Sequence, residues 1–366
     1  MPYRCRRQES VDPDPDPAFI APIPTTGHGQ DQASLMRTIG YVTPDNNEAM
    51  FALTPEGDGR LGALRFVGAD LLHEADWLVV NGDTGVPIPT TIPRSRRLLF
   101  LSEPPEVLRL TRGFVEQFGT IVGGVDVPGY SGMQFRSHPA IHWFFSGSIT
   151  ARGWQQTMSY AELRDLPPPG DKQTAISVVL SKKTQTPQHR ARLVFVEALQ
   201  KRFPDRVKVF GSGFERIDQK ADAILPYKYH LALENNDIPH FWTEKLADAL
   251  LGWSLPVHAG CKNVSGYFPP KSFVPLDLQN QNEAMDTVAR LLDSDPYDDH
   301  LDAIATARRS LIEEHTVFAV ARRVIEAIEP GCRYDAPTDG EIIRPDLAFR
   351  FWKRVRRYFR PKKKAG

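Results

Sequence analysis

One short segment of the chain, 234–245, concentrates carboxylate, amide and ammonium groups. Thr243 within it can cap a helix, because a threonine hydroxyl accepts a hydrogen bond from a free backbone N–H. Glu244 and Lys245 then fall in the first helical turn, where several N–H groups lack intrahelical partners. Such a helix start suits a phosphate group. The side chains presented beside it are Glu234, Asn235, Asn236, Glu244 and Lys245.

The elements around this segment place it at the edge of a sheet. Residues 229–233 have the pattern of a strand, and residues 255–258 have the pattern of the next one. Between them, a helix that begins at Thr243 can end at Gly252. The strand-to-helix loop of such a unit lies at the carboxyl edge of a sheet, where α/β proteins bind ligands. One face of the predicted helix is apolar and consists of Leu246, Ala249, Leu250 and Trp253.

Strands and helices alternate along the rest of the chain, and this alternation favours an α/β fold with mainly parallel sheets. The predicted strands are 75–80, 97–101, 120–122, 175–180 and 207–210, and the predicted helices are 107–118, 190–203 and 282–292. A Pro-rich linker at 166–170 separates two large parts, and an Asp-Pro repeat marks a disordered start. We therefore predict two facing Rossmann-like domains with a cleft between them. The predicted parts are the disordered segment 1–34, a first domain 35–166, a second domain 171–330 and a C-terminal segment 331–366.

The order of motifs between 227 and 273 resembles the family 10 glycosyltransferases, the α-1,3/1,4-fucosyltransferases. The motifs that carry the resemblance are Tyr227-Lys228, Leu233-Glu234-Asn235, Thr243-Glu244-Lys245, Pro256-Val257, Gly260, Pro269-Pro270 and Lys271-Ser272-Phe273. The resemblance implies the two-domain fold called GT-B, with GDP-fucose in the second domain and the glycan acceptor in the first. It implies an inverting transfer of L-fucose to a GlcNAc or Glc hydroxyl, in glycan biosynthesis, with no cofactor and no essential divalent metal.

The resemblance also implies cationic contacts to the donor phosphates. Lys245 lies near the helix start, where a cation opposes the helix dipole at a cost of about 0.3–1 kcal/mol. A bound diphosphate would reverse that cost, although a solvated surface lysine is the alternative. Arg192 is the second candidate, because its planar guanidinium suits phosphate oxygens. Arg190, two positions earlier, competes for this role.

The resemblance assigns the nucleoside to other side chains of the same segment. Glu244 would accept hydrogen bonds from the ribose hydroxyls, with helix capping as its alternative role. Asn235 would line the nucleotide pocket, unless its amide bonds its own loop. Glu234 would face the fucose or hold the loop. Phe241 stands where the family commonly has Tyr, so the donor could be another GDP-sugar, or the chain could be a binding module without catalysis.

Glu103 is the candidate general base, because Ser102-Glu103-Pro104 follows a predicted strand of the first domain and resembles a family element. An inverting transfer needs one carboxylate that accepts the proton of the acceptor hydroxyl, and diphosphate leaves without a strong acid. A glutamate at a strand end beside a proline turn is the alternative reading. Glu106 is the competing base.

The charge distribution points to a membrane surface. Formal net charge is zero, yet residues 345–366 hold nine Lys or Arg against one Asp. Apolar residues at helical spacing run through this basic tail, as in an interfacial helix on anionic lipid. A nucleic-acid or nonspecific basic tail is the alternative; we expect no nucleic-acid partner. The apolar positions are Leu347, Phe351, Val355 and Tyr358.

The remaining features of the sequence indicate the cellular compartment of the protein. Three cysteines lie far apart and indicate neither a disulfide framework nor a zinc site. The Asp-x-Asp pairs fall in the predicted disordered start and at 293–295, a helix end, so we predict no metal site. No stretch has the length of a membrane span, and the start lacks a secretory core. We therefore expect a cytoplasmic protein that is peripheral on the inner membrane.

Overall fold

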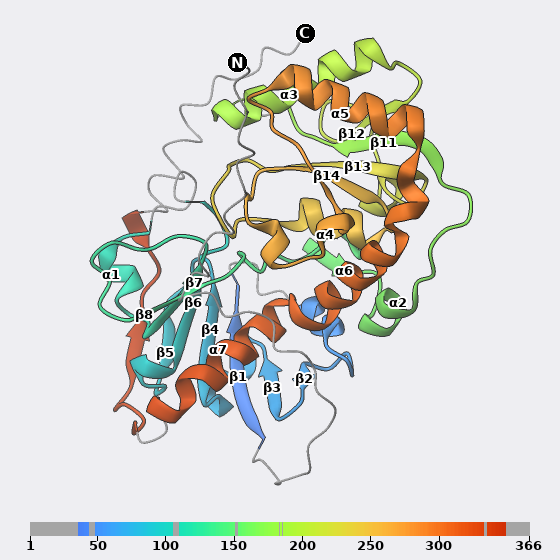
Figure 1. The fold of residues 1–366 in the computed structure, drawn as a ribbon. Coiled ribbons are helices and arrows are strands. Elements are labelled where there is room, and N and C mark those ends of the chain that lie inside the picture. Colours follow the sequence, from blue (N-terminus) through green and yellow to red (C-terminus); the bar gives the residue numbers. More distant parts are fainter. Residues whose placement is uncertain are drawn as a thin grey trace, which may run out of the picture.

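The computed structural model describes residues 36–43, 48–104, 110–150, 153–182, 184, 186–332 and 335–348. Two parallel sheets organise this part of the chain, each in its own α/β layer structure (Figure 1). This is the arrangement that the resemblance implies, and it confirms the predicted fold class. The predicted segment 1–34 and nearly all of the basic tail lie outside the described residues.

The first sheet has seven strands in the order β2-β3-β1-β4-β6-β7-β8. All neighbouring strands are parallel except β2 and β3. β4 and β6 are buried along their whole length, as expected for central strands of a sheet covered on both faces. The strands are β1 Arg37–Val42, β2 Arg60–Leu61, β3 Leu64–Val67, β4 Trp77–Asn81, β6 Arg97–Phe100, β7 Thr120–Gly123 and β8 Met133–Arg136.

The second sheet has the order β12-β11-β13-β14-β15 and is parallel throughout. Helices α3 and α5 cover one face, and α4 and α6 cover the face toward the first domain (Figure 1). The predicted strands and helices of this half are all present, with ends that differ by a few residues. The strands are β11 Gln173–Val179, β12 Val207–Phe210, β13 Tyr227–Leu233, β14 Leu255–Ala259 and β15 Val274–Pro275.

The seven helices of the described residues are α1 Arg112–Val115, α2 Tyr160–Asp165, α3 Pro187–Arg202, α4 Glu244–Leu251, α5 Gln281–Ser294, α6 Leu301–Glu314 and α7 Val317–Cys332. Of the helix predicted at 107–118, residues 110–118 are described, and only α1 is α-helical among them. Two short pairs of strands complete the fold: β9 Gly147–Thr150 with β10 Gly153–Gln156, and β5 Ile88–Thr90 with β16 Glu341–Ile343. No helix of the described residues has the length and apolar character to cross a membrane.

Helix α7 returns the chain to the first domain. The ring of Phe318, near its start, packs 5.4 Å from the ring of Tyr41 and 4.9 Å from that of Phe66, measured between centroids. Most of the helix is buried, so its apolar pattern alone does not tell which sheet it covers. Residues 171–330 were expected to form the second domain, but the last helix of that range covers the first sheet.

Candidate active site

The predicted strand–loop–helix unit is β13, the loop after it, and α4. Thr243 caps α4 with its hydroxyl, which accepts a hydrogen bond from the backbone N–H of Lys245 at 3.4 Å. The helix ends at Gly252, as the sequence predicts. Six consecutive residues of α4, from Leu246 to Leu251, are buried, so packing fixes the helix and its amino end firmly.

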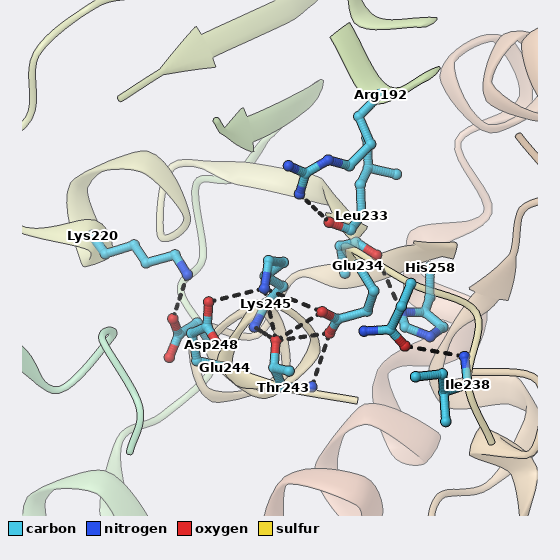
Figure 2. Close-up of polar contacts among 12 residues, drawn as sticks. Arg192, Lys220, Leu233, Glu234, Ile238, Thr243, Glu244, Lys245, Asp248 and His258 are labelled. Carbon is cyan, nitrogen blue, oxygen red and sulfur yellow. Dashed lines mark hydrogen bonds and ion pairs between the residues drawn. The ribbon is translucent and has the colours of Figure 1, made fainter. Parts of the chain in front are cut away.

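Glu234 holds the start of α4 through contacts of its carboxylate with Thr243 and Lys245 (Figure 2). Its side chain is fully buried, and its carboxylate accepts hydrogen bonds from Thr243 N–H at 2.8 Å and from Thr243 Oγ1 at 2.8 and 2.9 Å. The ammonium of Lys245 lies 3.1 Å from its Oε2. These contacts are those of a residue that holds the loop, which is one of the two roles expected for Glu234.

Glu244 and Lys245 form a charged pair in the first turn of α4. The ammonium of Lys245 lies 3.1 Å from Glu244 Oε1 and 2.9 Å from Thr243 Oγ1. Burial would raise the pKa of Glu244, but the ammonium groups of Lys245 and Lys220 outweigh it and lower that pKa to about 2. Burial would lower the pKa of Lys245, yet the carboxylates of Glu234 and Glu244 raise it. Both groups are therefore charged at neutral pH.

Arg190 and Arg192, two positions apart on α3, point in different directions. Arg192 is buried, and its Nη1 donates to the carbonyl oxygen of Leu233, the last residue of β13, at 2.9 Å (Figure 2). Its Nε has no hydrogen-bond partner among the described residues. Burial lowers the pKa of Arg192, and the nearby carboxylates of Glu234 and Glu244 oppose this effect. Arg190 is exposed and donates to the carbonyl oxygen of Thr184. The structure thus brings Arg192, rather than Arg190, to the site.

Asn235 and Phe241 lie in the same loop in different environments. Asn235 is half-buried, whereas Phe241 is buried, with 5% of its surface exposed. The next amide, Asn236, accepts the backbone N–H of Ile238 at 3.0 Å and tightens the loop. Its Nδ2 is buried and has no partner among the described residues. Asn236, which the sequence analysis placed in the loop without a role, is therefore a second amide of the site.

An ion pair behind α4 was missed by the sequence analysis. Lys220 Nζ lies 2.6 Å from Oδ2 of Asp248, and Oδ1 of Asp248 accepts the backbone N–H of Phe145 in the first domain at 2.9 Å. Burial raises the pKa of Asp248 to about 6, against the opposing effect of Lys220. The available signal was Asp248 itself, an acidic residue within the otherwise apolar run from Leu246 to Leu251. The pair connects α4 to the first domain.

The carboxyl edge of the first sheet reaches the same loop. Glu103 is exposed and follows β6, and the next strand, β7, leads to Gly124. A Cβ on Gly124 would lie only 2.8 Å from the carbonyl oxygen of Pro239, in the loop before α4. Glu103 therefore lies at the edge of the first sheet that meets the loop before α4. Glu106 is outside the described residues, so the structure does not compare the two candidates.

The side chains gathered here offer cationic and carboxylate groups at one helix start. Two cationic side chains, Arg192 and Lys245, stand beside a helix start, which favours phosphate oxygens. Glu244 offers an ionised carboxylate to hydroxyl groups. Within the described residues, no three His, Cys, Asp or Glu side chains are grouped so that they could hold a metal ion.

Comparisons with known proteins agree with this reading of the second domain. The family model described as glycosyltransferase family 10 (fucosyltransferase), C-terminal, matches residues 170–302. An α-(1,3)-fucosyltransferase of Helicobacter pylori is 32% identical over 112 residues, which are 29% of this chain and 23% of that protein. A 4-galactosyl-N-acetylglucosaminide 3-α-L-fucosyltransferase of Homo sapiens is 25% identical over 214 residues, 57% of this chain and 51% of the relative.

The similarity to these curated relatives spans about a quarter to a half of their length. A solved α1,3-fucosyltransferase with GDP-fucose has 16% identity and a TM-score of 0.44, and the match covers 80% of this chain and 95% of that one. The family match includes β13, its loop and α4, the elements that build the site described above. Residues 170–302 are therefore similar to the C-terminal domain of the family 10 glycosyltransferases, the fucosyltransferases.

Proposed function

We propose that this protein is an inverting fucosyltransferase, which moves L-fucose from GDP-fucose to a GlcNAc or Glc hydroxyl of a glycan, in α-1,3 or α-1,4 linkage. The observation that carries the proposal is the charged pair Glu244–Lys245 at the capped start of α4, with Arg192 beside it. The family match over residues 170–302 supports the choice of a fucosyl donor.

In this proposal the second domain holds the leaving group. Lys245, Arg192 and the amino end of α4 bind the diphosphate, and they stabilise the negative charge that develops as it departs. Glu244 accepts hydrogen bonds from the two ribose hydroxyls. Asn235 and Phe241 line the nucleotide pocket, where Phe241 supplies apolar contact in place of a hydroxyl.

The first domain supplies the base. Glu103 accepts the proton of the acceptor hydroxyl while that oxygen bonds to the anomeric carbon of fucose. The bond from this carbon to the diphosphate breaks, and GDP leaves with the electron pair. Attack from the face opposite to GDP inverts the anomeric configuration. No metal takes part in these steps, so EDTA is expected to leave the rate unchanged.

Transfer from GDP-fucose to lactose and N-acetyllactosamine, with the product linkage determined, tests the proposal. We expect Glu103→Gln to abolish turnover while GDP binding is retained, and Lys245→Met to weaken GDP binding. Lys262→Met is a matched control, because this lysine is an exposed one in the same domain. Binding of GDP-fucose without transfer to any acceptor would instead favour a non-catalytic module.

The substitution of Phe for the usual Tyr at 241 supports a second candidate donor, another GDP-sugar such as GDP-mannose. Thermal stabilisation by a panel of nucleotide sugars separates the two donors. Stabilisation by GDP-mannose but not by GDP-fucose would replace the donor in our proposal. Stabilisation by a UDP-sugar alone would contradict both.

The basic tail supports a location on the inner membrane, facing the cytoplasm. Each basic residue near an anionic surface contributes roughly 1 kcal/mol. Flotation with vesicles of anionic lipid should therefore recover the full chain but not a chain that ends at Ala348. Equal recovery of the two chains would refute membrane binding by the tail.

A further inference from the structure

The described part of the chain that follows α7 runs along the edge of the first domain and reaches the loops after β4 and before α1. β16 pairs antiparallel with β5, with Ile343 opposite Ile88 (Figure 1). Ile343 is completely buried in the second hydrophobic cluster of that domain. We call residues 341–346 the C-terminal strap. The pairing of β16 with β5 and the burial of Ile343 fix this strap to the first domain.

The strap has separate anchors at its two ends. Near the amino end of β6, Glu341 pairs with Arg97 Nη2 at 2.6 Å. In the middle, the side-chain amide of Gln117 accepts the backbone N–H of Arg344 at 2.8 Å and donates to its carbonyl oxygen at 3.0 Å. The strap then reaches the opposite end of the sheet at Asp346. The two ends can therefore be perturbed independently.

Asp346 joins two loops at the carboxyl edge of the sheet. Only 3% of its surface is exposed. Its Oδ2 accepts the backbone N–H of Thr111 at 2.5 Å, and its own backbone N–H donates to Oδ1 of Asp83 at 3.2 Å. Thr111 is the N-cap of α1, and Asp83 follows β4. A buried carboxylate that accepts a backbone N–H holds its partner strongly, because the bond is charge-assisted.

Contacts among described residues lead from Asp346 to the candidate base. Gly82, beside Asp83, donates its N–H to the carbonyl oxygen of Phe100 at 2.9 Å. A Cβ on Gly82 would lie 3.1 Å from Oγ of Ser102, so the two loops are in close contact. Ser102 directly precedes Glu103. The backbone N–H of Asp346 therefore supports the loop on which Glu103 lies through the loop that follows β4. Its carboxylate holds Thr111, at the α1 end of the segment 101–111 that carries Glu103.

We propose that Asp346 is a positioning residue for Glu103, so that the C-terminal strap sets the place of the general base. The inference rests on the proposed function of Glu103. A general base must lie within hydrogen-bond reach of the acceptor hydroxyl. A displacement of about 1 Å in such a group can cost roughly 100-fold in rate. Loss of the Asp346 contacts should thus slow the transfer and leave the donor site, in the other domain, intact.

The test compares Asp346→Ala and Asp346→Asn with the control Glu341→Gln. The control breaks the anchor at the far end of the same strap. For Asp346→Ala we expect kcat to fall about 10-fold or more, with an unchanged Kd for GDP. Asp346→Asn keeps an acceptor oxygen and should recover part of the rate. Glu341→Gln should leave both constants close to those of the native protein.

Amide hydrogen exchange provides a readout that does not depend on turnover. Asp346→Ala should speed exchange at Thr111, whose backbone N–H loses its acceptor, whereas Glu341→Gln should not. A native kcat in Asp346→Ala, or an equal loss of kcat in Glu341→Gln, would overturn the inference. A native protein that transfers no fucose to any acceptor would refute the proposed function itself, and the positioning role with it.

Discussion

Glu234→Gln is the substitution that best separates a loop-holding role from a sugar-binding one. The native carboxylate is buried, accepts three hydrogen bonds from Thr243 and lies 3.1 Å from the ammonium of Lys245. The amide keeps the shape of the side chain but loses the charge. Lys245 then retains only the carboxylate of Glu244 as an ionic partner. The amide NH₂ group cannot accept a hydrogen bond, yet it replaces an oxygen that accepted bonds from Thr243 and Lys245.

The magnitude follows from these contacts. Removing one partner of a buried ion pair costs about 3–5 kcal/mol. Because Lys245 keeps Glu244 as a partner and is partly exposed, we expect a loss near the lower limit, about 3 kcal/mol of unfolding free energy. The helix start that would bind the diphosphate also loses its fixed position. We therefore expect GDP binding to weaken by about 10-fold, or roughly 1.4 kcal/mol.

Calorimetric titration with GDP and with GDP-fucose, together with denaturant unfolding, measures these effects. If Glu234 holds the loop, GDP and GDP-fucose lose affinity by the same factor. If it contacts fucose, only GDP-fucose loses affinity and stability changes little, a result that would refute our reasoning. Glu283→Gln is the matched control, because Glu283 is an exposed carboxylate that bonds the N-cap of α5, Asn280, in the same domain. It should change neither binding nor stability by more than about 0.5 kcal/mol.

Three further substitutions test other parts of the structure. Gly124→Ala should slow transfer without preventing folding, because a Cβ 2.8 Å from the carbonyl oxygen of Pro239 must push the two domains apart; unchanged steady-state kinetics would contradict this. Lys172→Met should cost about 2–4 kcal/mol in denaturant unfolding, because the buried ammonium bonds four oxygen atoms, among them the carbonyl oxygen of Leu225 at 2.8 Å, and methionine replaces none of these bonds. The folded-state pKa of Glu244, about 2, lies below its ordinary value of 4.5, so its contribution to stability is present above pH 4.5 and is lost as the pH falls toward 2. Glu244→Gln should accordingly flatten the dependence of stability on pH in that window, and an unchanged slope would argue against the ion pair.

Interactions between residues close in sequence determined the part of the site formed by β13, the loop after it and α4. The N-cap at Thr243, the helix end at Gly252 and the strands on either side depend on neighbouring residues, so the sequence alone predicted them. The motifs that resemble family 10, between 227 and 273, also lie within residues 170–302, which the family model matches. The donor-binding and catalytic roles stay predictions for all of the site residues, Glu103, Arg192, Glu234, Asn235, Phe241, Thr243, Glu244 and Lys245.

Only the tertiary structure decided which side chains meet across the chain. Arg190 and Arg192 are two positions apart on α3, so they point about 200° apart around a helix of 3.6 residues per turn, and only packing selects the one that faces β13. The Asp248–Lys220 pair and the return of α7 to the first sheet likewise join residues distant in sequence. The contact of Asp346 with Thr111 spans more than half of the chain. Sequence periodicity shows which faces are apolar, but the partner of each face depends on how the domains pack.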